Sequence, residues 1–255
     1  MFWALDENSC RIYASTDISS DKKYFCPICK QQVRLRSAKE DNLNSPHFFH
    51  VERCADDWNY EPMSEWHISW QNLFPKGNRE IVIENPKTKE RHRADVGVYG
   101  TIIEFQHSPI SEHEFWKRNN FYTSIGYKVV WVFDMTELTR DSIWGSTTRL
   151  HLEGEWHKEW GGGGKYRWKN PWRFLGGFVP QQEKNIDIFI CYGPLSETPK
   201  AEDADGCIER VTWVNPDFTP AWGRFHTSYN IINYSELLAW LKNRWEKTNH
   251  ITPHK

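Results

Sequence analysis

Apolar and polar residues alternate along residues 91–106, on both sides of a two-residue turn at 99–100. The alternation predicts two short antiparallel strands, because the glycine in the turn tolerates the positive φ that a tight hairpin requires. Side chains two residues apart on a strand point to the same face, so Asp95, Glu104 and Gln106 are predicted to face the same way. The hairpin therefore brings two carboxylates and an amide together on neighbouring strands.

The segments that flank this hairpin predict an α/β core. Apolar residues at helical spacing, with Ser64 as N-cap, predict a helix over 64–74. Residues 111–125 predict a second helix, because a hydroxyl at its start and a carboxylate three residues later form a capping box. Residues 79–84 predict a strand, and the apolar run 127–134 predicts a strand buried on both faces. The order helix, three strands, helix, strand predicts a mixed sheet with the two carboxylates on its central hairpin.

The hydrophobic pattern also predicts elements near the start of the chain and after residue 150. Residues 2–15 predict a hairpin whose two short strands flank a polar turn. Residues 185–192 and 208–214 predict strands, and residues 235–245 predict an amphipathic helix. The segment 156–173 is aromatic and basic, so it is either a loop that stacks bases and contacts phosphates or a solvated loop with tryptophans in the core.

Composition places the chain among globular proteins without choosing a partner. A chain of 255 residues with 38% hydrophobic and 15% aromatic content can bury a substantial core. The formal net charge of -2 neither requires nor excludes a polyanionic partner, because binding responds to local patches. No apolar run reaches the roughly 18 residues that span a bilayer, and the first residues lack the pattern of a signal peptide. We therefore expect a cytoplasmic protein without a membrane segment.

Three of the six cysteines lie close together in the sequence. Cys26 and Cys29 form a Cys-Pro-x-Cys turn before a predicted strand, which is the shape of a zinc knuckle. His50 and Cys54 can converge across one turn, whereas His47 is three residues from His50 and points to the opposite face of a strand. The expected zinc ligands are Cys26, Cys29, His50 and Cys54, with His47 in reserve. The alternative is a pair of buried thiols with surface histidines.

The acidic face of the hairpin has two interpretations. A charge on an otherwise apolar strand must be solvated, paired or bound to a cation, because burying a bare charge is very costly. Asp95 and Glu104 therefore belong either to a solvated sheet face, with Arg93 as an ion-pair partner, or to a metal site. Glu65, in the first turn of the helix over 64–74, likewise either interacts with the helix dipole or takes part in catalysis.

A series of short motifs runs through residues 2–140 in a fixed order. The motifs are Tyr24-Phe-Cys-Pro-Ile-Cys, His47-Phe-Phe-His, Ser64-Glu-Trp-His, Arg93-Ala-Asp-Val, Ile103-Glu-Phe-Gln-His-Ser, Arg118, Phe121-Tyr122 and Val130-Trp-Val-Phe-Asp. As a series they resemble the competence protein CoiA-like family, in which a zinc-knuckle module is joined to a nuclease domain of the PD-(D/E)xK, restriction-endonuclease-like superfamily.

The resemblance implies an α/β fold with a restriction-endonuclease-like mixed-sheet core of order α-β-β-β-α-β. It also implies an N-terminal β-rich zinc-knuckle module, and the C-terminal part is expected to be an α+β extension. The expected domains are a hairpin and zinc-binding module over 1–60, a PD-(D/E)xK-like nuclease core over 61–150 and the extension over 151–255.

The resemblance also assigns roles to individual residues. In that superfamily an Asp and a Glu on adjacent strands bind Mg²⁺ or Mn²⁺, which corresponds to Asp95 and Glu104 here. The ion would polarise the scissile phosphate and lower the pKa of an attacking water. Glu65 corresponds to the helical glutamate of the superfamily, which orients water or assists a second ion. Arg93 and Arg118 are candidate phosphate contacts.

The chain departs from the superfamily at Gln106, where most members have lysine. Glutamine can orient an attacking water by hydrogen bonds, but it cannot supply a positive charge or act as a base. The CoiA-like family itself has this Glu-x-Gln form. His67 either compensates for the missing lysine or is a structural residue of its helix.

Together these features predict a metal-dependent nuclease, a hydrolase that uses Mg²⁺ or Mn²⁺ to cleave DNA phosphodiester bonds and holds structural zinc. Such a protein would act in DNA uptake, recombination or phage defence. The alternative is a catalytically weak or inactive nucleic-acid-binding module that helps to process or load DNA, which Gln106 and the segment 156–173 favour. RNA is not excluded as a substrate, because no residue reports on the 2′-hydroxyl.

Overall fold

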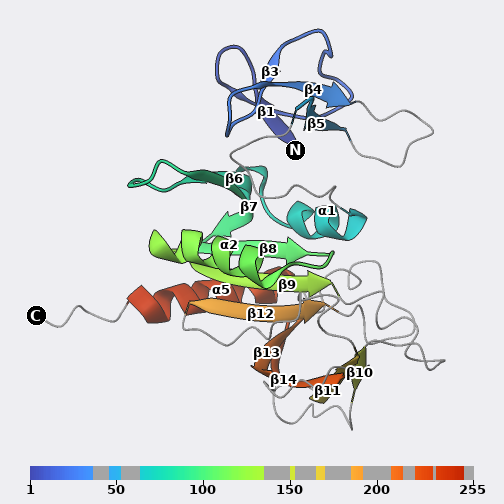
Figure 1. Ribbon diagram of the computed structural model, residues 1–255, viewed down its shortest axis with the longest axis vertical. Helices are drawn as coiled ribbons and strands as arrows, with labels where there is room; N and C mark the ends of the chain where they lie inside the picture. Colours follow the sequence, from blue (N-terminus) through green and yellow to red (C-terminus); the bar gives the residue numbers. More distant parts are fainter. Residues whose placement is uncertain are drawn as a thin grey trace, which may run out of the picture. The chain divides into compact units, whose positions relative to one another are not determined.

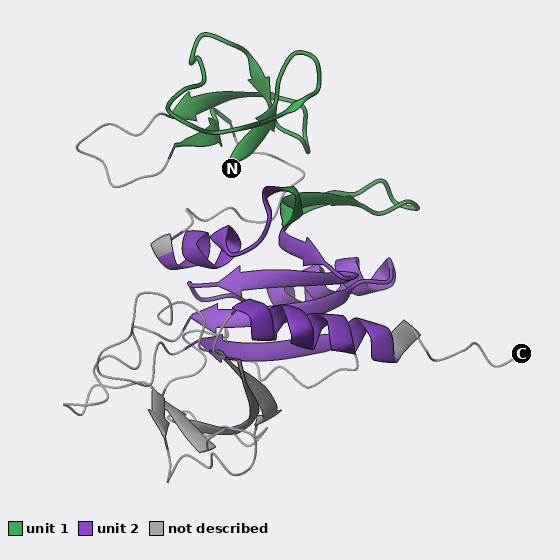
Figure 2. Cartoon of the chain, turned by 180° about the vertical axis from the view of Figure 1, so that it is seen from behind, with its two compact units in different colours: residues 1–62, 77–94 green, residues 63–76, 95–255 purple. Residues whose placement is uncertain are grey.

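The computed structural model describes residues 1–36, 46–52, 64–134, 150–152, 165–169, 185–191, 208–214, 222–231 and 234–249. Within these residues the protein is a mixed α/β structure with two sheets and three α-helices. The chain forms two compact units, here called unit 1 (residues 1–62 and 77–94) and unit 2 (residues 63–76 and 95–255) (Figure 2). The domain boundaries expected near residues 60 and 150 stay predictions.

Unit 1 contains a five-stranded antiparallel sheet with the strand order β2-β1-β3-β4-β5. Figure 1 labels four of these strands, β1, β3, β4 and β5. Its strands are β1 (Trp3–Leu5), β2 (Arg11–Tyr13), β3 (Tyr24–Phe25), β4 (Gln32–Arg36) and β5 (His47–His50). The pairing of β1 with β2 confirms the hairpin predicted over residues 2–15. Main-chain hydrogen bonds in both directions between Met1 and Phe48 join the start of the chain to β5.

The core of unit 1 lies on one face of this sheet. Its buried side chains are Met1, Ala4, Tyr24, Cys26, Ile28, Val33 and Phe48. On β4, Val33 is buried between the exposed residues Gln32 and Arg34. This alternation gives β4 one face toward the core and one toward solvent.

The second sheet has nine strands in the order β10-β11-β14-β13-β12-β9-β8-β7-β6. They are β6 (Arg79–Glu84), β7 (Arg91–Val98), β8 (Thr101–Gln106), β9 (Lys128–Asp134), β10 (Leu150–Leu152), β11 (Lys165–Lys169), β12 (Ile186–Cys191), β13 (Ile208–Val214) and β14 (Trp222–Ile231). The sheet is mixed, because β9 runs parallel to both β8 and β12, whereas β7 and β8 are antiparallel. Every residue of β9 and β12 is buried, as the continuous apolar pattern of a strand covered on both faces requires.

Three α-helices pack on this sheet: α1 (Glu65–Asn72), α2 (Glu112–Ser124) and α5 (Tyr234–Asn249). On one face Phe115 of α2 packs against Trp131, with 4.9 Å between ring centroids, and α5 lies on the other face (Figure 1). Trp70 of α1 and Leu237 of α5 belong to one apolar cluster with Phe105 of β8. The strands around β8 therefore lie between α2 on one side and α1 with α5 on the other. Among the described helices, none is long and apolar enough to cross a bilayer.

The central hairpin forms where the alternation predicts it. The elements α1, β6, β7, β8, α2 and β9 follow the predicted order, with a short 3-10 turn (Lys76–Asn78) before β6. Tyr99 has φ 48° and Gly100 has φ 60°, and two positive φ angles in succession are what a type I′ hairpin turn requires. Gly100 also lies directly under the Trp245 ring of α5, since a Cβ at this position would be 1.9 Å from a ring carbon.

The helix ends are also capped as the sequence predicts. The Ser64 hydroxyl accepts a hydrogen bond from the His67 N–H at 3.3 Å, and the Ser111 hydroxyl accepts one from the Glu114 N–H at 3.1 Å. Gly126, with φ 93°, follows the last turn of α2 and allows the chain to leave the helix. These caps fix where α1 and α2 begin relative to the strands that carry the carboxylates.

Candidate functional site

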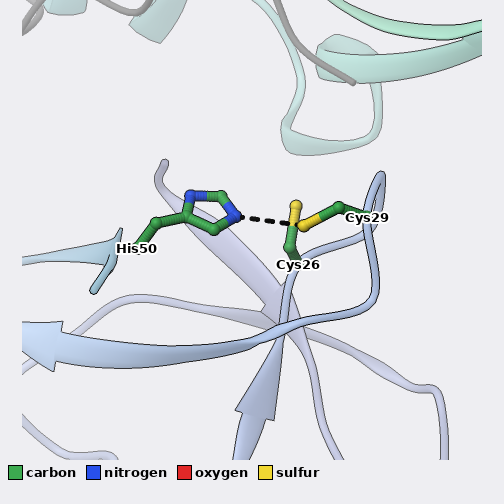
Figure 3. A group of neighbouring side chains, drawn as sticks. All are labelled: Cys26, Cys29 and His50. Atoms are coloured by element: carbon green, nitrogen blue, oxygen red, sulfur yellow. Dashed lines mark hydrogen bonds between the residues drawn. The ribbon is translucent and has the colours of Figure 1, made fainter. Parts of the chain in front are cut away.

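Unit 1 brings together three of the predicted metal ligands, Cys26, Cys29 and His50 (Figure 3). The cysteines come from the tight turn between β3 and β4, and the histidine comes from the end of β5. Their ligand atoms lie within 4.8 Å of one another, and Cys29 Sγ is 3.4 Å from His50 Nε2. The turn is closed by a hydrogen bond from the Lys30 N–H to the Cys26 carbonyl at 3.1 Å. The turn and β5 together position the cluster.

The chemistry of this cluster suits a metal ion. Burial raises the pKa of the Cys26 thiol, although the main-chain N–H groups of Cys29 and Ile28 oppose the shift. A bound cation reverses this preference, because cysteine binds metals as the thiolate and loses its proton on binding. Two sulfurs and one imidazole nitrogen are donors that structural zinc takes. We therefore identify Cys26, Cys29 and His50 as a candidate metal site.

The other two predicted zinc ligands are Cys54 and His47. Cys54 lies outside the described residues. His47 is paired with Arg36 on β4, and it is not part of the three-residue cluster. A tetrahedral site needs a fourth ligand, for which Cys54 stays the prediction.

In unit 2, Asp95 lies where β7 and β8 separate. The hairpin pairing ends one step before Asp95, and its register places Asp95 opposite Glu104. Asp95 Oδ2 accepts the Phe105 N–H at 2.8 Å. Asp95 Oδ1 accepts a hydrogen bond from Gln71 Nε2 at 3.2 Å and lies 3.0 Å from His67 Nε2. Strand β8 thus holds one oxygen of this carboxylate and helix α1 holds the other.

Glu104, on β8, is only 2% exposed and is held by α2. Its Oε1 accepts the Tyr122 hydroxyl at 2.9 Å, and its Oε2 is 3.1 Å from Arg118 Nη1. The Arg118 guanidinium also donates to Glu114 Oε1 through Nε and Nη2, both at 2.9 Å. Arg118 therefore lies between the carboxyl groups of Glu104 and Glu114.

The two facing carboxylates differ in their tendency to ionise. Burial raises the pKa of Glu104 to about 8, and the negative charge of Asp95 adds to this shift against the opposing effects of Arg118 and Tyr122. Burial also raises the pKa of Asp95. Its final pKa nevertheless lies below the ordinary value, because the charge and hydrogen bond of His67 and the hydrogen bond from the Phe105 N–H lower it. Near neutral pH the pair therefore holds a proton on Glu104, and a cation between the carboxylates would displace it.

The remaining predicted site residues occupy different positions. Gln106 donates from Nε2 to the Ser108 carbonyl at 2.7 Å. Glu65 is the first residue of α1, and its side chain lies outside the described residues. Arg93 belongs to unit 1, where its Nε is 3.7 Å from Glu80 Oε1. The roles expected for these residues stay predictions.

Sequence reasoning did not connect Gln71 or Tyr122 to the carboxylates. Gln71 is four residues from His67, and Tyr122 is four residues from Arg118, so each pair shares a helix face. The spacing is visible in the sequence, but it does not say which strand residue a helix face covers. The contact between His107 Nδ1 and Asp134 Oδ2, at 2.7 Å, was also not expected, since it depends on β8 and β9 being neighbours.

Comparison with known proteins bears on this second site. Residues 68–152 match the family described as competence protein CoiA, nuclease-like domain. The matched segment contains Asp95, Glu104, Arg118 and Tyr122, but not the cysteines of unit 1. Comparison with curated proteins and with solved structures gave no match. The match confirms the resemblance found from the motifs.

Proposed function

We propose that this chain, which belongs to the CoiA-like family through its nuclease-like domain, is a metal-dependent nuclease that hydrolyses DNA phosphodiester bonds in DNA uptake, recombination or phage defence. The observation that carries the proposal is the placement of Asp95 and Glu104, which the register of β7 and β8 sets opposite each other and which hydrogen bonds hold in place. The opposite directions of their pKa shifts support it. The proposal includes a restriction-endonuclease-like core, for which the order α1, β6, β7, β8, α2, β9 is the support.

The donor atoms of this pair fit a hard divalent cation such as Mg²⁺ or Mn²⁺. These ions prefer carboxylate oxygens, water and phosphate oxygens as ligands, so two protein carboxylates are enough. When bound, the ion supplies charge stabilisation at the phosphoryl group and activates the attacking water. The negative charge of Asp95 favours a cation at this position, and the cation would have to displace the proton that the raised pKa of Glu104 retains.

The chain's own residues would prepare this site. His67 and Gln71 orient the Asp95 carboxylate through Oδ1. Arg118 holds the Glu104 carboxyl group in place through Oε2 before the cation binds, and we propose that it then contacts the scissile phosphate. Gln106 would orient the attacking water by hydrogen bonds, since glutamine has donors and an acceptor but no charge.

Two further roles come from the family resemblance. We propose that Glu65 orients water or assists a second ion, and that Arg93 is a second phosphate contact. We also propose structural zinc in unit 1, bound by Cys26, Cys29 and His50 with Cys54 as fourth ligand. The support for zinc is the convergence of two sulfurs and one imidazole in a module with a small apolar core.

The test is cleavage of end-labelled single-stranded, duplex and branched DNA, and of single-stranded RNA, with and without Mg²⁺ or Mn²⁺. We expect metal-dependent cleavage of DNA that falls by about a thousandfold or more in Asp95→Ala, since the metal is worth several kcal/mol to the transition state. The matched control is Glu112→Gln, an exposed carboxylate in the first turn of α2 that should leave cleavage unchanged. Unchanged cleavage by Asp95→Ala would refute the site, and absence of cleavage on every substrate would refute the nuclease.

One observation favours a second candidate function. The Gln106 amide donates to the Ser108 carbonyl, so its side chain is turned to the backbone in this conformation. A site without lysine whose glutamine is engaged elsewhere would bind nucleic acid and cleave it slowly or not at all. Gln106→Lys distinguishes the two functions: a large gain in cleavage indicates a weakened catalyst, whereas a loss indicates that glutamine is the residue this site uses.

A further inference from the structure

The outer face of the unit 1 sheet has a distinct chemistry. Arg34 on β4 is paired with Phe49 on β5, and Arg36 is paired with His47, so these four side chains share one face. Their neighbours Val33 and Phe48 point to the opposite face and are buried in the core. The face that carries the arginines is therefore the solvent face, here called the Arg34–Phe49 face.

Aromatic and cationic groups alternate across the Arg34–Phe49 face. Gln32 on β4 is paired with Phe25 on β3, which adds a second half-buried aromatic ring beside the arginine row. The Arg36 guanidinium lies over the Phe49 ring, 5.0 Å from its centroid. No carboxylate occupies any of the six positions on this face: Phe25, Gln32, Arg34, Arg36, His47 and Phe49.

The two arginines remain available to an external anion. Both are exposed, and neither forms an ion pair within the described part of the chain. A structural arginine would normally have a carboxylate partner or a buried fork of hydrogen bonds. Two cations beside an aromatic ring, with no counter-charge among the described residues, are suited to contacting a backbone phosphate and a stacked base.

We infer that the Arg34–Phe49 face binds single-stranded DNA at a second site, separate from the carboxylates of unit 2. A base stacks on the Arg36–Phe49 pair, because aromatic rings and guanidinium planes both present flat faces to an unpaired base. Arg34 contacts the adjacent phosphate. A duplex does not fit this mode, since its bases are already stacked on one another. The choice of DNA over RNA rests on the proposed function.

The candidate metal site lies on the opposite side of the same strands. His50 is the neighbour of Phe49 on β5, and the alternation of a strand turns its ring to the opposite side, where it meets Cys29. The turn that contains Cys26 and Cys29 leads directly into β4. A metal bound by this turn and by His50 would therefore join the start of β4 to the end of β5, the strands that carry Arg34 and Phe49.

Binding is measured by fluorescence anisotropy with a labelled oligothymidine, using the full chain with its zinc and no added Mg²⁺ or Mn²⁺. We expect Phe49→Ala to weaken binding about tenfold and Phe49→Tyr to preserve it. The double substitution Arg34→Ala and Arg36→Ala should weaken binding and reduce the slope of log Kd against log salt by about 0.7, because Arg34 makes one phosphate contact and each such contact on a single strand contributes about 0.7. The matched control removes two exposed lysines of the same unit, Lys22→Ala with Lys23→Ala, and should leave both quantities unchanged.

Several outcomes would overturn the inference. A change of less than about twofold in Phe49→Ala, an equal loss in the lysine control, or tighter binding of single-stranded RNA through the same residues would each do so. If Phe49→Ala loses its zinc, the exposed arginine pair decides the question, since those substitutions remove no core contact. The assay measures binding without added Mg²⁺ or Mn²⁺ and does not depend on cleavage, so a failure of the nuclease proposal and a failure of this site give different results.

Discussion

The two candidate metal sites differ in what holds their side chains before a metal binds. In unit 1 the donors converge on one another, with Cys29 Sγ 3.4 Å from His50 Nε2. In unit 2 each of the four oxygens of Asp95 and Glu104 has its own protein partner, supplied by α1, β8 or α2. We therefore expect the metal to be part of the fold in unit 1 and an exchangeable cofactor in unit 2.

The difference follows from the cores behind the two sites. The core of unit 1 consists of a few side chains from short strands, which is little apolar area for an independent fold. The carboxylates of unit 2 lie beside a larger cluster that includes Trp70, Phe74 and Phe105. A site on a large core can hold charged groups in place by hydrogen bonds, whereas a site on a small core depends on its ligand.

Among the tests of this comparison, we expect the largest effect on folding from removal of the proposed zinc ligands in unit 1. The double substitution Cys26→Ser and Cys29→Ser should abolish the proposed zinc binding and unfold unit 1, because a structural metal would supply folding free energy there. Metal analysis and hydrogen exchange are the measurements: amides of β3 to β5 should lose protection while those of β8 and β9 keep it. Cys10→Ser, an exposed cysteine outside the cluster, is the control. Protection of β3 to β5 in the zinc-free variant would contradict a metal-dependent fold.

A smaller effect is expected from breaking the ion pair that holds Glu104. Arg118→Met removes a nearly buried cation from between Glu104 and Glu114, and we expect a loss of about 3 kcal/mol in the free energy of unfolding. Urea unfolding of the protein without added Mg²⁺ or Mn²⁺ measures this change. Lys242→Met, which removes an exposed ion pair with Glu246, should change stability by less than about 0.5 kcal/mol. Equal effects of the two substitutions would mean that Arg118 does not organise the site.

The smallest effect concerns pH. The folded-state pKa of Glu104 is about 8, against 4.5 for the ordinary group. The folded protein thus binds a proton that the unfolded chain releases, so the stability contributed by this proton is full below pH 4.5 and is lost as the pH rises through about 8. Glu104→Gln should flatten this loss and raise Tm at pH 8 above that of the unmutated chain, because the glutamine amide does not titrate in this range.

Thermal unfolding from pH 5 to pH 9 without added divalent ions measures this change, with Glu112→Gln as the control. Added Mg²⁺ should raise Tm of the unmutated chain more at pH 8 than at pH 6, because binding releases the Glu104 proton. It should have little effect on Glu104→Gln. A pH profile of Glu104→Gln that matches the unmutated chain would show that another group titrates in this range.

Much of this structure is predictable because its elements are specified locally. Ser64 and Ser111 cap their helices as expected, and the turn at Tyr99 and Gly100 has the two positive φ angles that its sequence allows. The spacing of Cys26 and Cys29 likewise indicates a tight turn whatever the surrounding fold. These features depend on a few consecutive residues, so the sequence contains what is needed to predict them.

The parts that could not be predicted depend on which elements become neighbours. The strand Ile186–Cys191 was expected as a strand, but its place beside β9 in parallel register depends on pairing across more than 50 residues. The contacts of Gln71 with Asp95 and of Tyr122 with Glu104 also require the packing of a helix on a sheet. Periodicity gives the face of an element, but not the element that this face meets.

The boundary between the two units has a consequence for inheritance. The chain passes between them three times, at residues 62–63, 76–77 and 94–95, and the last passage falls inside β7. A recombination event that exchanged one consecutive segment for unit 1 would leave behind β6 and the first half of β7. Unit 1, which contains the cysteine cluster, therefore cannot be exchanged as one consecutive segment.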